Sequence, residues 1–245
     1  MTAPVLTVDQ VVDRMTQLAA ELPPGDGVAV FNAMYLTVTR LVRDHLAAAY
    51  FDDPAAMAEL DAVFAARYLT AVDEDRAGRR PDACWRPLFE LRAAPDVHPL
   101  QFALAGMNAH IENDLPLAVL DTCRLTGRTP DRLHADYLRV NALLAQVEAQ
   151  VRESLLPVPV GGPLLHVLSV WSIDRARDAA WASVLALWEL RRLPPARALV
   201  ADALSGSVGM VGRALLTPLS GTRAPAPRVP VHGGRPADPR TGASQ

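Results

Sequence analysis

The sequence predicts an all-α protein, on three observations. Apolar residues recur at spacings of three and four along most of the chain, as on the buried face of a helix. Helix-start signals separate these stretches, most clearly Thr7-Val8-Asp9-Gln10 and Asp53-Pro54. No stretch alternates with a period of two, so no sheet is expected. We therefore expect one bundle of about seven to nine helices over residues 5–218.

The elements follow from local signals. The capping box at Thr7 opens a first helix that ends near Glu21, and a turn leads into a second helix over about 28–50. Asp53 and Pro54 are an N-cap acid and a first-turn proline, and they open a third helix that ends near Gly78. A short helix is expected over about 83–93, another helix starts at Pro99, and a long one spans about 129–155. The last two helices start at 172 and at Pro194-Pro195: the first ends at this proline pair, and the second ends near 216.

Two segments are not expected to be regular helices. From residue 219 the chain is rich in Pro, Gly, Arg and Ala, which predicts a disordered tail over 219–245. The longest uncharged run, 154–173, contains three prolines and two glycines, so it predicts a loop and a helix start rather than a membrane span.

Composition narrows the function classes. The net charge is −3, so composition suggests neither a nucleic-acid partner nor an anionic membrane surface. All 24 basic residues are arginine, so no lysine can act as a Schiff base or a phosphate clamp. The two cysteines match no zinc or redox spacing and are expected to be reduced thiols. The first residues lack the pattern of a signal peptide, so we expect a cytoplasmic protein, with the oligomeric state left open.

The segment 106–116 is the most informative part of the chain. It places His110 and Asp114 four residues apart, on what the spacing predicts to be the apolar face of a helix. Burying such groups is costly unless they are paired or bound to a metal. Gly106, one turn earlier, leaves room for another backbone or for a ligand. Pro116 cannot donate to the Glu112 carbonyl and crowds that turn, so the central helix should be kinked here.

Three interpretations of the pair stay open. The two side chains bond each other and fix the kink, or they are two metal ligands spaced like the histidines of H-E-x-x-H, or Asp114 orients His110 for acid–base catalysis. A divalent metal, if one is bound, would use His110, Asp114 and Asp61. In either functional interpretation we expect a small-molecule pocket with His110 and Asp114 as the catalytic pair. Its other walls are expected to be Tyr35, Thr39, Asp61, Asn108, Asn141 and Arg175.

The common catalytic signatures are missing from the sequence. It contains no G-x-S-x-G elbow, no phosphate-binding G-x-x-x-x-G-K-[ST], no G-x-G-x-x-G, no H-E-x-x-H and no D-D-x-x-D cluster. The sequence therefore gives no reason to expect a serine hydrolase, a P-loop nucleotidase, a dinucleotide-dependent enzyme or a diphosphate-ionising terpene synthase.

Four pieces of the chain together resemble an uncharacterised, largely actinobacterial, all-helical family of unknown function. The most specific piece is N-A-H-I-x-x-D-L-P at 108–116, and the others lie at 31–39, 60–69 and 171–181. The resemblance covers about residues 8–195 and implies a helical fold, with no established activity.

A more distant similarity concerns metal chemistry. His110, Asp114 and Pro116 look like part of the H-x-x-x-D-x-x-x-P motif of helical zinc-dependent phospholipases C and nucleases. In those families such a His and Asp bind zinc inside a helical bundle. Here the proline follows the Asp by two residues rather than four, and the other histidine ligands are not evident. The similarity implies at most a one-metal site that includes Asp61.

These observations favour a helical enzyme that acts on a small apolar or lipid-like metabolite by acid–base or metal-assisted chemistry. The alternative is a non-catalytic binding or scaffold domain in which His110 and Asp114 are a structural pair.

Overall fold

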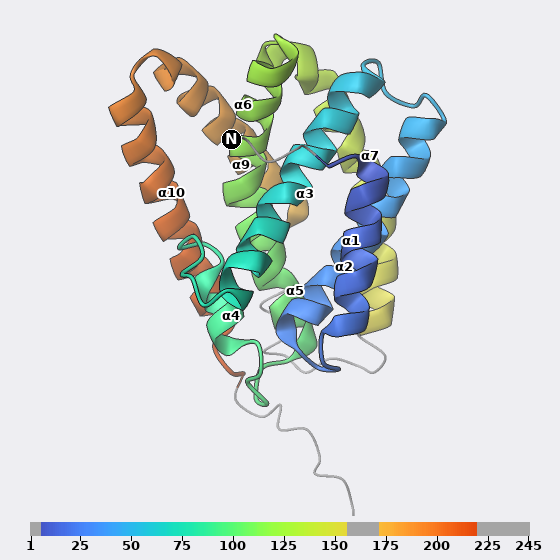
Figure 1. Ribbon diagram of the computed structural model, residues 1–245, viewed down its shortest axis with the longest axis vertical. Helices are drawn as coiled ribbons and strands as arrows, with labels where there is room; N and C mark the ends of the chain where they lie inside the picture. Colours follow the sequence, from blue (N-terminus) through green and yellow to red (C-terminus); the bar gives the residue numbers. More distant parts are fainter. Residues whose placement is uncertain (1–5, 156–171, 220–245) are drawn as a thin grey trace, which may run out of the picture.

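The computed structural model describes residues 6–155 and 172–219. Within these ranges every regular element is a helix, which confirms the predicted fold class (Figure 1). The α-helices are α1 (Val8–Glu21), α2 (Gly27–Ala47), α3 (Pro54–Arg76), α4 (Arg86–Leu91), α5 (Pro99–Asn108), α6 (Leu115–Thr126), α7 (Pro130–Leu155), α9 (Ile173–Glu189) and α10 (Pro194–Leu215). A π-helical turn, η1 (Ala109–Asp114), joins α5 to α6, and a 3-10 turn, η2 (Leu190–Arg192), joins α9 to α10.

The helix starts follow the predicted caps. The Thr7 hydroxyl accepts from the Gln10 backbone N–H, and the Gln10 side chain accepts from the Thr7 N–H, so the capping box of α1 is complete. The Asp53 carboxylate accepts from the Ala56 N–H at the start of α3. The predicted tail lies outside the described residues except for Leu219, as does most of the uncharged run at 154–173.

One continuous helix, α5–η1–α6, forms the centre of the bundle (Figure 1). Its first part packs against α2 and α10, and its last part packs against α3 and α9. Helix α1 covers α2 and α3, while α7 packs against α2 and α9. Because η1 lies at the midpoint of this central helix, its side chains are enclosed by neighbouring helices on several sides.

Two glycines allow the closest approach between α2 and α5. A Cβ on Gly27 would lie 2.4 Å from the Phe102 ring, and one on Gly106 would lie 2.3 Å from the Phe31 ring. These distances are shorter than real Cβ contacts, so any larger residue would force the two helices apart. The space beside Gly106 is therefore filled by the side chain of Phe31, not by another backbone.

A buried carboxylate ties the connection between α2 and α3 to α7. Asp136 on α7 is 2% exposed and accepts hydrogen bonds from the backbone N–H groups of Asp52 and Asp53, at 2.9 and 2.8 Å. Arg139 Nη1 lies 2.8 Å from the same carboxylate. The Asp136 carboxylate therefore satisfies two backbone donors that would otherwise lack partners in the protein.

Helix α10 is anchored over only part of its length. Its second half packs on the bundle through Val208, Gly209 and Gly212, which are buried. Its first half leans away from the bundle, as the gap beside α9 in Figure 1 shows. Among the described helices, α10 is the one that could cross a membrane by its length and composition. In its most apolar stretch of 18 residues, 17% is buried.

Candidate functional site

The site is built on the π-turn at the middle of the central helix. The predicted kink is confirmed, and it takes the form of η1, where the Leu115 N–H bonds to the His110 carbonyl five residues earlier. An ordinary helical turn would press the Pro116 ring against the Glu112 carbonyl. The wider turn just before the proline lets the helix continue through Pro116 into α6. It also sets the position of His110 and Asp114, which lie on the turn itself.

Three donors converge on the Asp114 carboxylate. His110 Nδ1 lies 3.0 Å from Asp114 Oδ2, and the Trp85 indole Nε1–H donates to the same oxygen at 3.0 Å. The Asn113 amide donates to Asp114 Oδ1 at 2.9 Å. Both Asp114 and His110 are 2% exposed. A carboxylate surrounded by donors fixes the histidine with its proton on Nδ1, which leaves the lone pair of Nε2 free.

Aromatic rings enclose the His110 imidazole. It stacks on the Phe64 ring with the centroids 3.6 Å apart and the planes 6° from parallel. The Tyr35 ring meets it edge-on at 4.4 Å, and Phe31 and Trp85 lie at 5.9 Å. This burial lowers the pKa of His110 below the usual 6.5, although the hydrogen bond to Asp114 acts in the opposite direction. His110 is therefore a neutral base at neutral pH.

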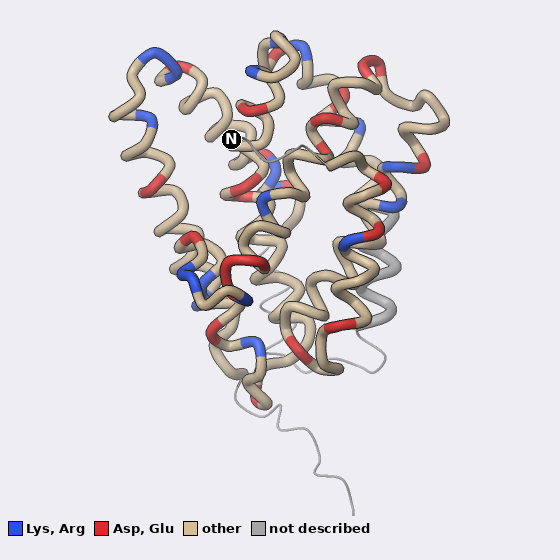
Figure 2. Tube along the Cα trace, viewed as in Figure 1, with Lys and Arg blue, Asp and Glu red and all other residues tan. Residues whose placement is uncertain are grey.

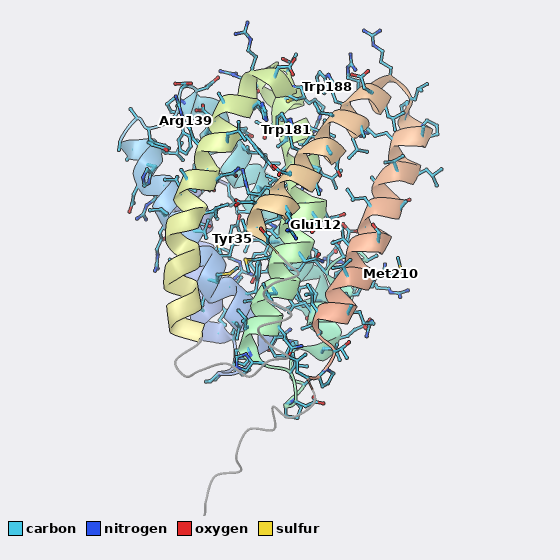
Figure 3. All side chains as sticks on the ribbon, turned by 180° about the vertical axis from the view of Figure 1, so that it is seen from behind. Tyr35, Glu112, Arg139, Trp181, Trp188 and Met210 are labelled. Carbon is cyan, nitrogen blue, oxygen red and sulfur yellow. The ribbon has the colours of Figure 1, made fainter. Side chains whose placement is uncertain are left out.

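Seven buried side-chain atoms of the described residues have no hydrogen-bond partner. Three of them are His110 Nε2 on η1, Tyr35 Oη on α2 and Asp61 Oδ2 on α3. Burial raises the pKa of Asp61 to about 7, so this carboxyl is partly protonated at neutral pH. Burial, and then the charge of Asp61, raise the pKa of Tyr35 well above its ordinary value. Tyr35 lies in the interior of the bundle (Figure 3).

The structure thus brings together three of the predicted site residues, His110, Asp114 and Tyr35. Asp61 lies one turn before Phe64 on α3, close enough for its charge to raise the pKa of Tyr35. Thr39 lies one turn beyond Tyr35 on α2, fully buried, and its hydroxyl donates to the Tyr35 carbonyl at 3.0 Å. Thr39 lies close enough to lower the pKa of Tyr35, although burial and the charge of Asp61 raise this pKa by more. Thr39 is therefore at the edge of the site.

The other three predicted residues lie elsewhere. Asn108 is fully buried and donates to the Val208 carbonyl of α10 at 2.9 Å. Asn141 on α7 accepts from the guanidinium of Arg177 on α9. Arg175 is exposed, and the buried arginine of α9 is Arg177, two residues later. The geometry does not bring Asn108, Asn141 and Arg175 to one place. Their assignment to substrate binding stays a prediction.

Sequence reasoning missed the residues that complete the site. Trp85 supplies a donor to Asp114 from just before α4, and Phe64 supplies the stacked ring from α3. A buried tryptophan needs an acceptor for its indole N–H, which was a usable signal for Trp85. Phe64 lies one turn after Asp61 on α3, and no local pattern indicates that its ring stacks on His110.

The pair is poorly arranged as two ligands of one metal. His110 Nδ1 and Asp114 Oδ2 face each other, and Trp85 already donates to that oxygen. Among the described residues no group of three His, Cys, Asp or Glu side chains could hold a metal ion. A ligand role is left only for His110 Nε2, with Asp114 as the carboxylate that orients the ring.

The comparisons with known proteins identify a family and add no activity. No curated protein and no solved structure matches the chain. The family model described as "Family of unknown function (DUF5995)" matches residues 8–218 and so covers nearly all of the described chain. The protein therefore belongs to the DUF5995 family.

Proposed function

We propose that the protein is an acid–base enzyme in which His110 Nε2 moves a proton on a small, mostly apolar molecule held between α2, α3 and η1. The observation that carries this proposal is that η1 and the two helices packed on the His110 ring each hold an unpartnered, buried polar atom: His110 Nε2, Tyr35 Oη and Asp61 Oδ2. Buried polar groups are nearly always hydrogen-bonded, and an exception calls for an explanation such as a ligand, an ordered water or a catalytic role.

The chemistry of the three groups suits proton transfer. His110 is held neutral by burial with its Nε2 lone pair free, so it can accept a proton. Asp61, with a pKa of about 7, can donate one. A neutral base beside an acid that still holds its proton near neutral pH is what general acid–base catalysis needs. The surrounding rings of Phe31, Tyr35 and Phe64 suit a molecule whose surface is largely apolar.

Deuterium exchange tests the proposal without a known substrate. The protein is incubated in D2O with a small-molecule extract of its host cells, and mass spectrometry follows deuterium uptake at carbon. We expect at least one metabolite to gain deuterium with the wild type and not with His110→Asn. Asparagine keeps an amide donor at the position of Nδ1, toward Asp114, and removes Nε2. His45→Asn, on the partly buried end of α2, is the matched control.

One observation favours a structural role instead. Asp114 is fully bonded, and its donors connect the segment before α4 to the π-turn. In that case no extract component exchanges with the wild type, while Asp114→Ala still loses about 3 kcal/mol or more of unfolding free energy, because three buried donors lose their acceptor. A wild type without any exchange in extracts and with this stability loss would overturn the enzymatic proposal.

A further inference from the structure

The exposed apolar surface of the protein is concentrated on one hairpin. Of nine large hydrophobic residues that are exposed in the described chain, six lie on the hairpin of α9, η2 and α10: five on the two helices, and Leu193 between η2 and α10. Three of these six lie at the hairpin tip, which we define as residues 190–200. Leu193 is 58% exposed, Leu199 71% and Val200 38%. Such a concentration on a soluble domain marks an interaction surface.

The same tip is strongly basic. Residues 190–200 hold three arginines and no acidic residue, in a chain whose net charge is −3. Arg191, Arg192 and Arg197 are all exposed, and none pairs with a carboxylate within the described part of the chain. Figure 2 shows basic residues at the apex of this hairpin, at the end of the molecule opposite to α4. The Arg191 guanidinium lies over the Trp188 ring at 4.6 Å.

We propose that the hairpin tip is a docking site for an anionic membrane surface. Exposed leucines flanked by unpaired arginines match a lipid surface whose headgroups are negative and whose interior is apolar. The tip includes none of the residues placed around His110, so the inference does not depend on the proposed enzymatic function.

The anchoring of α10 favours a surface contact over a span. The Asn108 amide donates to the Val208 carbonyl, and the Ser205 hydroxyl accepts from the Cys84 N–H. A Cβ on Gly209 would lie 2.4 Å from the Ala83 carbonyl oxygen, so the helix backbone rests directly on this segment. The second half of α10 would have to leave the bundle before the helix could cross a bilayer. Its first half is free to lie on one.

A second copy of the chain fits the tip less well. In a dimer with two-fold symmetry about this tip, the same patch meets itself. Arg191, Arg192 and Arg197 would then face their own copies, and like charges in an interface oppose association. An anionic surface attracts the same three arginines.

Vesicle flotation of the full-length protein tests the inference. We expect binding to phosphatidylcholine vesicles that contain half phosphatidylglycerol, little binding to pure phosphatidylcholine, and weakening in high salt. Replacing the three arginines of the tip by glutamine should weaken binding about five-fold for each arginine. Leu193→Ser with Leu199→Ser should weaken it about ten-fold. The matched controls are three exposed arginines and two exposed leucines away from the tip: Arg79→Gln, Arg80→Gln and Arg132→Gln, and Leu125→Ser with Leu138→Ser.

The outcomes separate the possible occupants of the tip. Wild type that does not float with anionic vesicles overturns the inference, as does equal loss of binding in the control variants. Light scattering is measured on the same samples. A dimer that the two leucine substitutions dissociate, without any vesicle binding by the wild type, would show that a second copy covers the tip instead.

Discussion

Asp114 and Asp136 are two carboxylates that are each 2% exposed, yet their neighbourhoods are bonded differently. Around Asp136 on α7 the polar groups find protein partners: its oxygens accept from the Asp52 and Asp53 backbone, and the adjacent Tyr137 hydroxyl donates to the Arg177 carbonyl at 2.7 Å. Around Asp114 the carboxylate is satisfied, while nearby His110 Nε2, Tyr35 Oη and Asp61 Oδ2 are not.

The difference separates a structural network from a candidate site. The α7 network closes on itself, so the fold alone accounts for it. The unpartnered atoms near η1 lose the hydrogen bonds that water gave them in the unfolded chain, and no protein contact restores those bonds. Proteins keep such unfavourable arrangements mainly at functional sites. The predictions below test whether the two regions differ in this way.

The largest effect is expected at Asp61. Its pKa is 3.8 in the unfolded chain and about 7 in the fold, which corresponds to about 4 kcal/mol. Because the folded pKa is the higher one, stability is greatest below about pH 4 and is lost as the pH rises through about 7. Asp61→Asn should therefore raise the free energy of unfolding at pH 8 by up to about 4 kcal/mol. Urea unfolding at pH 5 and pH 8 measures this, and an equal change at both values would contradict the prediction.

Asp136→Ala should give the next largest effect, in the opposite direction. It leaves the backbone donors of Asp52 and Asp53 without their acceptor, so we expect a loss of about 3 kcal/mol in urea unfolding. Asp52→Ala is the control, because the Asp52 side chain is 66% exposed and pairs only with Arg139 in the described chain. It should change stability by less than about 0.5 kcal/mol. Equal losses would show that the network does not depend on Asp136.

Two tyrosines give a matched test of the comparison. Tyr35 and Tyr137 are 4% and 2% exposed, and only Tyr137 has a hydrogen bond from its hydroxyl. Tyr137→Phe should cost about 1 kcal/mol in thermal or urea unfolding, while Tyr35→Phe should be neutral or slightly stabilising. A clear loss in Tyr35→Phe would mean that its hydroxyl has a partner in solution, such as an ordered water.

The smallest effect is a change of protonation, read by ¹⁵N NMR of the histidine rings. Burial lowers the pKa of His110, so its ring should still be neutral at pH 6.5, with the proton on Nδ1. Because the folded pKa of His110 is the lower one, its neutral ring contributes fully to the free energy of unfolding above pH 6.5. This contribution is lost as the pH falls below 6.5. A charged His110 ring at pH 6.5 would contradict the burial argument.

Local signals were sufficient for the helices and for the kink beside His110 and Asp114. Thr7, Asp53 and Pro54 fixed helix starts because caps act on backbone groups within one turn. The kink at Pro116 and the contact between His110 and Asp114 also depend on neighbours within five residues. The sequence could not identify Arg177 as the buried arginine, because Arg175 is two positions away and the packing against α7 decides which of the two faces inward.

The sequence by itself determined the fold class, the order of the helices, the kink and the placing of His110 and Asp114 on one helix face, all through interactions between residues close in the chain. Only the tertiary structure decided that Trp85 is the third group on this pair and that Phe64 stacks on the imidazole. It alone left Tyr35 and Asp61 without partners and divided α10 into an anchored half and a free half. These features join residues tens of positions apart, and their contacts depend on how whole helices pack, which no local pattern encodes.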